Sequence, residues 1–157
     1  MGVAVAFVMG LASAVCFVVN KYILIPLDLA YMQTVAFILV IASLVQFIEM
    51  FLQKAMPALY TALGVYLPLI TTNCTILGVT ILNIDNGYDF AESIVCAAGA
   101  GIGFLVAMVL FSGVRRRVEE AVTPKCFEGL PITLVAAAVT SLSFMGFGGI
   151  VESIFGA

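Results

Sequence analysis

Histidine and tryptophan are absent from this 157-residue chain, and only 10% of its residues are charged. Soluble domains usually carry about 25% charged residues, so the composition excludes an ordinary water-soluble protein. Without histidine, the chain has no imidazole for acid–base chemistry or for metal ligation. The formal net charge is −3, and the few cations do not form the basic surface that nucleic-acid binding requires. We therefore expect no nucleic-acid partner.

Cysteine is also sparse. The four cysteines show no CxxC pair and no dense framework, so a disulfide scaffold is not expected (Cys16, Cys74, Cys96 and Cys126).

The first residues, MGVAVAFVMGLASAV, have no basic region before the apolar run, which argues against a signal peptide. We expect instead that the chain begins inside a hydrophobic span.

Hydrophobic residues make up 64% of the sequence, with a mean hydropathy of +1.24. A helix needs roughly 20 residues to cross a hydrocarbon core of about 30 Å. Five segments of this length predict membrane spans, at 1–25, 33–53, 62–83, 92–113 and 131–155. The sequence thus predicts an all-α, polytopic membrane helical bundle that forms a single integral membrane domain over 1–157.

The basic residues predict the orientation of these spans. Arg115, Arg116, Arg117 and Lys125 place the 114–130 loop in the cytoplasm, because cytoplasmic loops carry the excess of lysine and arginine. Alternation puts the loop with Lys54 on the same side, and the acidic 83–90 loop and the C-terminus on the external side. Lys21, near the external end of the first span, is an exception.

Two short segments of the sequence are weakly similar to each other. SLVQF at 43–47 resembles SLSFMGF at 141–147, and each segment lies in the span that follows a helix rich in small residues. Pairing the first span with the fourth, and the second with the fifth, relates helices of opposite direction, as in inverted repeats. The 62–83 span then has no partner, and a three-plus-three architecture would place one before Met1. Chance recurrence of short apolar motifs is the alternative.

The stretch LPLITTNCTILG at 67–78 is unusual for a membrane span. Pro68 lacks an N–H group and is expected to interrupt the helix. Backbone groups freed in lipid must be satisfied by protein groups. Several polar side chains can do this, and two glycines beside the stretch allow close backbone approach (Thr71, Thr72, Asn73 and Thr75; Gly64 and Gly78). The sequence predicts a broken helix near the bilayer midplane.

Cys74 lies at the centre of this stretch and allows three interpretations. A cysteine thiolate is the usual ligand of iron–sulfur clusters, but a cluster needs about four ligands, so partners would have to supply the others. Cys74 could instead be a small apolar residue packed beside a kink. As a third possibility, the broken helix binds a substrate or ion through backbone carbonyls and threonine hydroxyls.

Other residues carry weaker signals. Glu49 is either an intramembrane carboxylate on an ion path or an interfacial group within reach of Lys54. GAGIG at 99–103 has the GxxxG spacing that permits tight helix packing. Cys16 and Cys96 lie in apolar helical surroundings and are expected to be inert, whereas Cys126 follows Pro124 in a polar loop.

Three segments together resemble a known family: ILIPLDLAYMQTVAFILVIASLVQFIEM at 23–50, LGVYLPLITTNCTILGV at 63–79 and FMGFGGIV at 144–151. They are similar to the A component of the Rnf complex, a membrane-bound ferredoxin:NAD oxidoreductase of bacteria and some archaea. The E component of the sodium-pumping NADH:quinone oxidoreductase has a similar LPLITTNC block and is the alternative. The short connection ILIPLDLAYMQT favours the Rnf protein.

The resemblance implies a six-helix protein with two inverted halves, each containing a half-helix with a cysteine. It implies that two homologous components, A and E, form a pseudo-symmetric pair in the cytoplasmic membrane, together with the B, C, D and G components. The pair would supply four cysteines to one [2Fe–2S] cluster, which relays electrons in a redox-driven Na⁺ or H⁺ pump. Cys74 matches the second-half cysteine. The first half-helix has no match here, so five of six helices are expected.

On this interpretation the chain is part of an enzyme complex but has no catalytic residue of its own. Two other kinds of function stay open from the sequence. One is a redox-inactive transporter or channel component, and the other is a purely structural membrane component.

Overall fold

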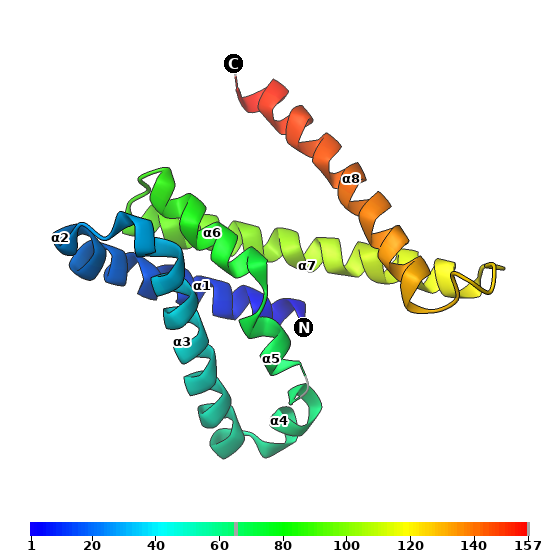
Figure 1. Cartoon of the computed structure of the whole chain (residues 1–157), viewed down its shortest axis with the longest axis horizontal. Helices are drawn as coiled ribbons and strands as arrows, with labels where there is room; N and C mark the ends of the chain where they lie inside the picture. Colours follow the sequence, from blue (N-terminus) through cyan, green and yellow to red (C-terminus); the bar gives the residue numbers. More distant parts are fainter. Residues whose placement is uncertain (65, 157) are drawn as a thin grey trace. The chain divides into compact units, whose positions relative to one another are not determined.

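A computed structural model describes residues 1–64 and 66–156, and within these ranges every regular element is a helix (Figure 1). The predicted all-α class is therefore confirmed. In chain order the elements are α1 (Gly2–Val19), the π-helix η1 (Asn20–Leu24), α2 (Ile25–Leu27), the 3₁₀-helix η2 (Ala30–Met32), α3 (Gln33–Ala55), α4 (Pro57–Leu63), α5 (Leu67–Thr71), α6 (Cys74–Asp85), α7 (Phe90–Glu120) and α8 (Leu130–Phe155).

Four continuous helical segments in the described part of the chain are long and apolar enough to cross a membrane. They are Gly2–Leu27, Ala30–Ala55, Phe90–Glu120 and Leu130–Phe155. These segments match four of the five predicted spans and confirm a polytopic membrane protein. The fifth predicted span, 62–83, is divided among α4, α5 and α6, as the expected broken helix requires. The inverted repeat stays a prediction.

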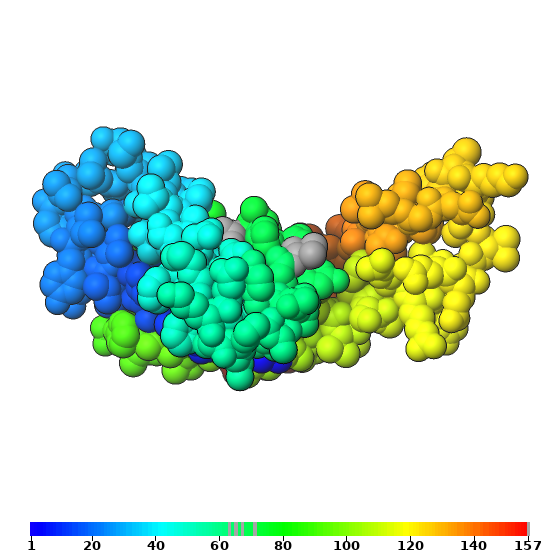
Figure 2. All heavy atoms as spheres, turned by 90° about the horizontal axis from the view of Figure 1, so that it is seen from below, coloured from blue at the N-terminus to red at the C-terminus, as the bar shows by residue number. Residues whose placement is uncertain are grey.

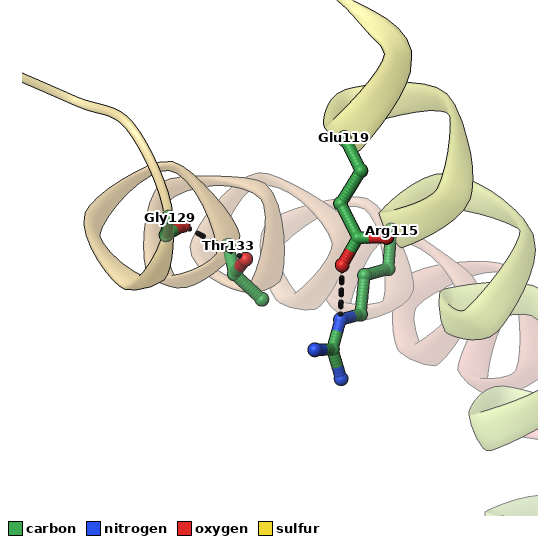
Figure 3. Close-up of polar contacts among 4 residues, drawn as sticks. All are labelled: Arg115, Glu119, Gly129 and Thr133. Carbon is green, nitrogen blue, oxygen red and sulfur yellow. Dashed lines mark hydrogen bonds and ion pairs between the residues drawn. The ribbon is translucent and has the colours of Figure 1, made fainter. Parts of the chain in front are cut away.

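Two predicted connections are shorter than the sequence suggested. The polar segment after residue 114 is expected to be a loop, but α7 continues through Glu120. Arg115 and Arg116 form ion pairs with the glutamates four residues later, and the Arg115 Nε to Glu119 Oε1 distance is 3.0 Å (Figure 3). Such pairs support a helix, so the arginine cluster lies on the last turns of α7. Likewise α6 continues to Asp85, into the predicted 83–89 connection.

The chain divides into two compact units, Met1–Leu105 and the part from Val106 onward, with the boundary inside α7. In the first unit, α1 packs against α3 and α6, and α3 also packs against α5 and α6. The core of this unit consists of apolar side chains from these helices and from α7 (Val5, Val8, Met9, Ala12, Cys16, Leu24, Phe37, Ile41, Val45, Ile70, Ile76 and Ala97). Figure 2 shows the side chains of α3 and the next segments, in cyan to green, on the near face of this unit.

Small residues allow α7 to approach α1 closely, but they are not the pair that the sequence suggested. A Cβ atom built at Gly101 would lie 2.8 Å from the Ala6 Cβ, whereas Gly99 and Gly103 have nothing within 4 Å of such an atom. Ala97, four residues before Gly101, is fully buried. The expectation of tight packing at 99–103 is therefore right, but its assignment to the GxxxG pair is wrong. The contact with Ala6 is made by Gly101, and the buried Ala97 lies on the same face of α7.

Candidate functional site

The predicted membrane span at 62–83 is divided by two breaks in the helix, one on each side of the five-residue helix α5. α4 ends at Leu63 and α5 begins at Leu67, so Pro68 lies in the first turn of α5, where its missing N–H costs nothing. Thr72 closes the other end of α5: its N–H donates to Pro68 O at 3.3 Å, and its hydroxyl donates to Leu69 O at 3.3 Å. Thr72 thus satisfies carbonyl groups that the end of a helix would leave free.

Asn73 begins the next helix. Its backbone is extended (φ −74°, ψ 108°), and its Oδ1 accepts a hydrogen bond of 3.1 Å from the Thr75 N–H. This is the geometry of a helix N-cap. The prediction that the polar run repairs a broken helix is therefore confirmed for Thr72 and Asn73. Thr75 contributes its backbone N–H, and the Thr71 side chain lies outside the part of the chain that the structure describes.

The cap at Asn73 gives a first testable prediction. Asn73→Ala removes the acceptor for the Thr75 N–H and is expected to lower the free energy of unfolding by about 1 kcal/mol. Asn73→Asp keeps the acceptor and serves as the matched control. The measurement is thermal unfolding of the purified complex in detergent. Equal loss in both variants would show that the cap does not hold this end of α6.

Cys74 is the first residue of α6, directly after the break, and its side chain is exposed. It lines a groove of about 300 Å³. The groove lies where α5 joins α6, and Figure 1 shows the ribbons of these two helices and of α3. The α3 side of the groove is apolar, and Thr72, Asn73 and Leu77 complete its lining (with Ile38, Ile41 and Ala42 from α3). In this chain Cys74 is thus not buried, and its thiol opens to the groove.

The remaining cysteines have different surroundings. Cys16 is fully buried in the core of the first unit, in agreement with an inert role. Cys96 is exposed on α7, and Cys126 is exposed in the segment between α7 and α8. In the described ranges no group of three or more histidine, cysteine, aspartate or glutamate side chains could hold a metal ion. Among the described residues the four cysteines thus lie as single thiols.

Glu49 is half-buried near the end of α3. Among the described residues no ion pair joins it to Lys54. The interpretation of Glu49 as an interfacial group within reach of Lys54 stays a prediction. Lys54 lines a groove with Phe47, Met50, Phe51 and Gln53. The ion-path interpretation of Glu49 stays a prediction.

The sequence did not predict a buried polar cluster in the first unit, which we call the polar node: Ser13 of α1, Asn83 of α6 and Ser93 of α7. Asn83 Nδ2 donates to Ser13 Oγ at 3.1 Å and to the Ser93 carbonyl at 3.2 Å. By polarity alone, Asn83 belongs to an external connection. The signal that could have found it is the spacing of Thr80 and Asn83, which continue the buried face of α6 begun by Ile76.

Comparison with known proteins gives consistent matches. The family described as "Rnf-Nqr subunit, membrane protein" matches residues 1–151. The A component of the Na(+)-translocating ferredoxin:NAD(+) oxidoreductase complex of Acetobacterium woodii is 56% identical over 149 residues, which cover 95% of this chain and 78% of the relative. The A components of the ion-translocating oxidoreductase complexes of Serratia proteamaculans and Syntrophotalea carbinolica are 52% and 51% identical, over 97% and 96% of this chain and 79% and 78% of theirs. The resemblance carried by the LPLITTNC block is confirmed.

Proposed function

Because the chain belongs to the Rnf-Nqr family of membrane proteins, we propose that it is the A-type membrane component of an ion-translocating ferredoxin:NAD oxidoreductase complex. The support is the identity of 56% to an A component over 95% of this chain. The relatives compared above are all A components of such complexes, which favours this assignment over the E component of the sodium-pumping quinone reductase. The proposed partners are the homologous E component and the B, C, D and G components, within a bacterial or archaeal cytoplasmic membrane.

We further propose that Cys74 is one ligand of a [2Fe–2S] cluster shared with the E component. The observation that carries this proposal is the position of the thiol: it is exposed at a helix break and opens to a groove. A ligand must be held by fixed backbone, and the Asn73 cap and the Thr72 hydrogen bonds supply this. When bound, such a cluster relays single electrons.

The residues present fit this role as a partial ligand set. A [2Fe–2S] cluster takes four ligands, and this chain brings one thiol to the groove, so the other three have to come from outside the residues that line it. The apolar α3 wall excludes water from one side of the thiol, and a dry, low-dielectric surrounding influences the potential of a metal centre. Thr72 and Asn73 offer polar groups at the same rim.

Iron content and low-temperature EPR spectra of the purified complex, wild type against Cys74→Ser, test this proposal. Loss of one [2Fe–2S] signal while the components still co-purify is the expected result, because a serine hydroxyl does not replace a thiolate at iron. Unchanged iron and spectrum would reject the ligand role. The groove at the break would then be better explained as an ion or substrate site, whose hydroxyl and carbonyl ligands survive this substitution.

The proposed orientation gives another prediction, at Cys126. This exposed cysteine lies between α7 and α8, in the segment that follows the arginine cluster predicting a cytoplasmic location. A membrane-impermeant maleimide should label Cys126 at least about tenfold faster in inverted vesicles than in right-side-out vesicles, because the lipid barrier excludes a charged reagent. Cys126→Ser gives the background labelling. The opposite preference would reverse the proposed topology.

A further inference from the structure

The polar node joins three helices at one side chain. Asn83 of α6 donates to Ser13 Oγ of α1 and to the Ser93 carbonyl of α7, and Ser13 Oγ donates to the same carbonyl at 3.4 Å. The three side chains are only 1–3% exposed. The orientation of the amide follows from its partner, because a backbone carbonyl can only accept a hydrogen bond and must therefore face Nδ2.

The node is not explained by a gain in stability alone. Asn83 Oδ1 and Ser93 Oγ are buried and have no hydrogen-bond partner among the described residues. A buried polar atom without a partner is costly, and this cost opposes the benefit of the two donated bonds. Buried polar groups with such a balance can fix one helix register among several apolar alternatives, as a buried asparagine does in coiled coils.

The register of α6 depends on a buried polar contact of this kind. It begins at a break, so no continuous helix before it sets its position along its axis; the hydrogen bonds of Thr72 and Asn73 fix only the local backbone at the break. Its buried face consists of Ile76, Thr80 and Asn83. Contacts of Ile76 are non-directional, and the Thr80 hydroxyl donates to Leu77 O within α6 itself at 2.8 Å. Of these three side chains, only Asn83 makes directional bonds to other helices.

We propose that Asn83 is a positioning residue: by fixing the register of α6 against α1 and α7, it sets the location of Cys74 at the other end of the same helix. Nine residues separate the two, a distance of roughly 13 Å along an unbroken helix. A slip of α6 by one turn would move the Cys74 thiol by about 5 Å, which a metal ligand does not tolerate. The inference rests on the proposed ligand role of Cys74.

The test compares Asn83→Leu with Thr80→Val in the purified complex. Leucine has a similar size and removes both interhelical bonds, and Ser13 still donates to the Ser93 carbonyl. Thr80→Val is the matched control, since Thr80 is equally buried on the same face but bonds only within α6. Three quantities are measured: the rate at which N-ethylmaleimide alkylates Cys74, resolved by peptide mass spectrometry; the EPR spectrum of the cluster; and the midpoint of thermal unfolding.

In Asn83→Leu we expect Cys74 to be alkylated about five to ten times faster, because two interhelical hydrogen bonds that hold α6 are lost. We also expect a shifted EPR spectrum and a nearly unchanged thermal midpoint. Thr80→Val should match the wild type in alkylation and spectrum. An unchanged alkylation rate in Asn83→Leu, or an equal change in both variants, would overturn the inference. If Asn83→Leu fails to assemble, Ser13→Ala, which removes one partner of Asn83, should show a smaller change in the same direction.

Failure of the ligand proposal gives a different result. Cys74 would then be alkylated rapidly in the wild type, and Cys74→Ser would keep the full iron content. The comparison of Asn83→Leu with Thr80→Val still decides whether Asn83 controls the location of the thiol, because the rate of alkylation depends on its position with or without a cluster.

Discussion

Cys74→Ser is expected to lower ferredoxin-dependent NAD reduction by the assembled complex at least about 100-fold. Substitutions in the shell around a metal site already cost 10- to 100-fold, and here a proposed ligand itself is replaced. The serine hydroxyl has nearly the size of the thiol, so α6 and the Asn73 cap should keep their geometry. The measurement is electron transfer from reduced ferredoxin to NAD, in complex normalised for protein content.

The matched control is Cys96→Ser, which changes another exposed thiol of the same chain at a position away from the break. We expect it to retain full turnover. Turnover of Cys74→Ser within about twofold of the wild type, a difference of only ~0.4 kcal/mol in the barrier, would exclude an electron-relay role for this residue. A purely structural role, or an ion site that tolerates the hydroxyl, would then explain the break.

Gly101→Ala is expected to lower the stability of the first unit. The added Cβ would lie 2.8 Å from the Ala6 Cβ and 3.0 Å from the Ala6 Cα, so α1 and α7 would have to separate. Overpacking of this kind costs about 1–3 kcal/mol. Thermal unfolding and the yield of assembled complex in detergent measure this loss.

Gly103→Ala, on the same helix, provides the control. A Cβ there meets nothing within 4 Å, and alanine is the better helix former by up to about 1 kcal/mol. This variant should be as stable as the wild type or slightly more stable. Equal effects of the two substitutions would mean that helix propensity, and not the contact with Ala6, determines the outcome.

The class of the fold could be predicted from composition because hydrophobic length alone decides which helices can span a bilayer. The four long helices lie close to their predicted bounds for this reason. The bounds were wrong where charged residues continue a helix. Arg115 and Glu119 resemble loop residues by polarity, but their spacing of four residues stabilises the last turns of α7.

The site could be predicted in part. The polar residues around Cys74 predicted a break, and Thr72 and Asn73 do satisfy its backbone groups. The polar node could not be predicted, because Ser13, Asn83 and Ser93 are separated by 70 and 10 residues and only tertiary packing brings them together. Isolated serines in apolar helices give no signal of a common partner, since they can also bond to their own backbone.

The shortness of α6 has a consequence for how the protein is made. Its 12 residues extend over about 18 Å, well below the ~30 Å of a hydrocarbon core. Such a segment cannot span the bilayer by itself, so one of its ends has to lie in the hydrocarbon region, where backbone groups that the Asn73 cap leaves free need protein partners. We therefore expect α6 to enter the bilayer only together with neighbours that cover this end. During synthesis it would stay at the translocon until α7 emerges, so that Cys74 reaches its depth in the membrane late, as the helices around it assemble.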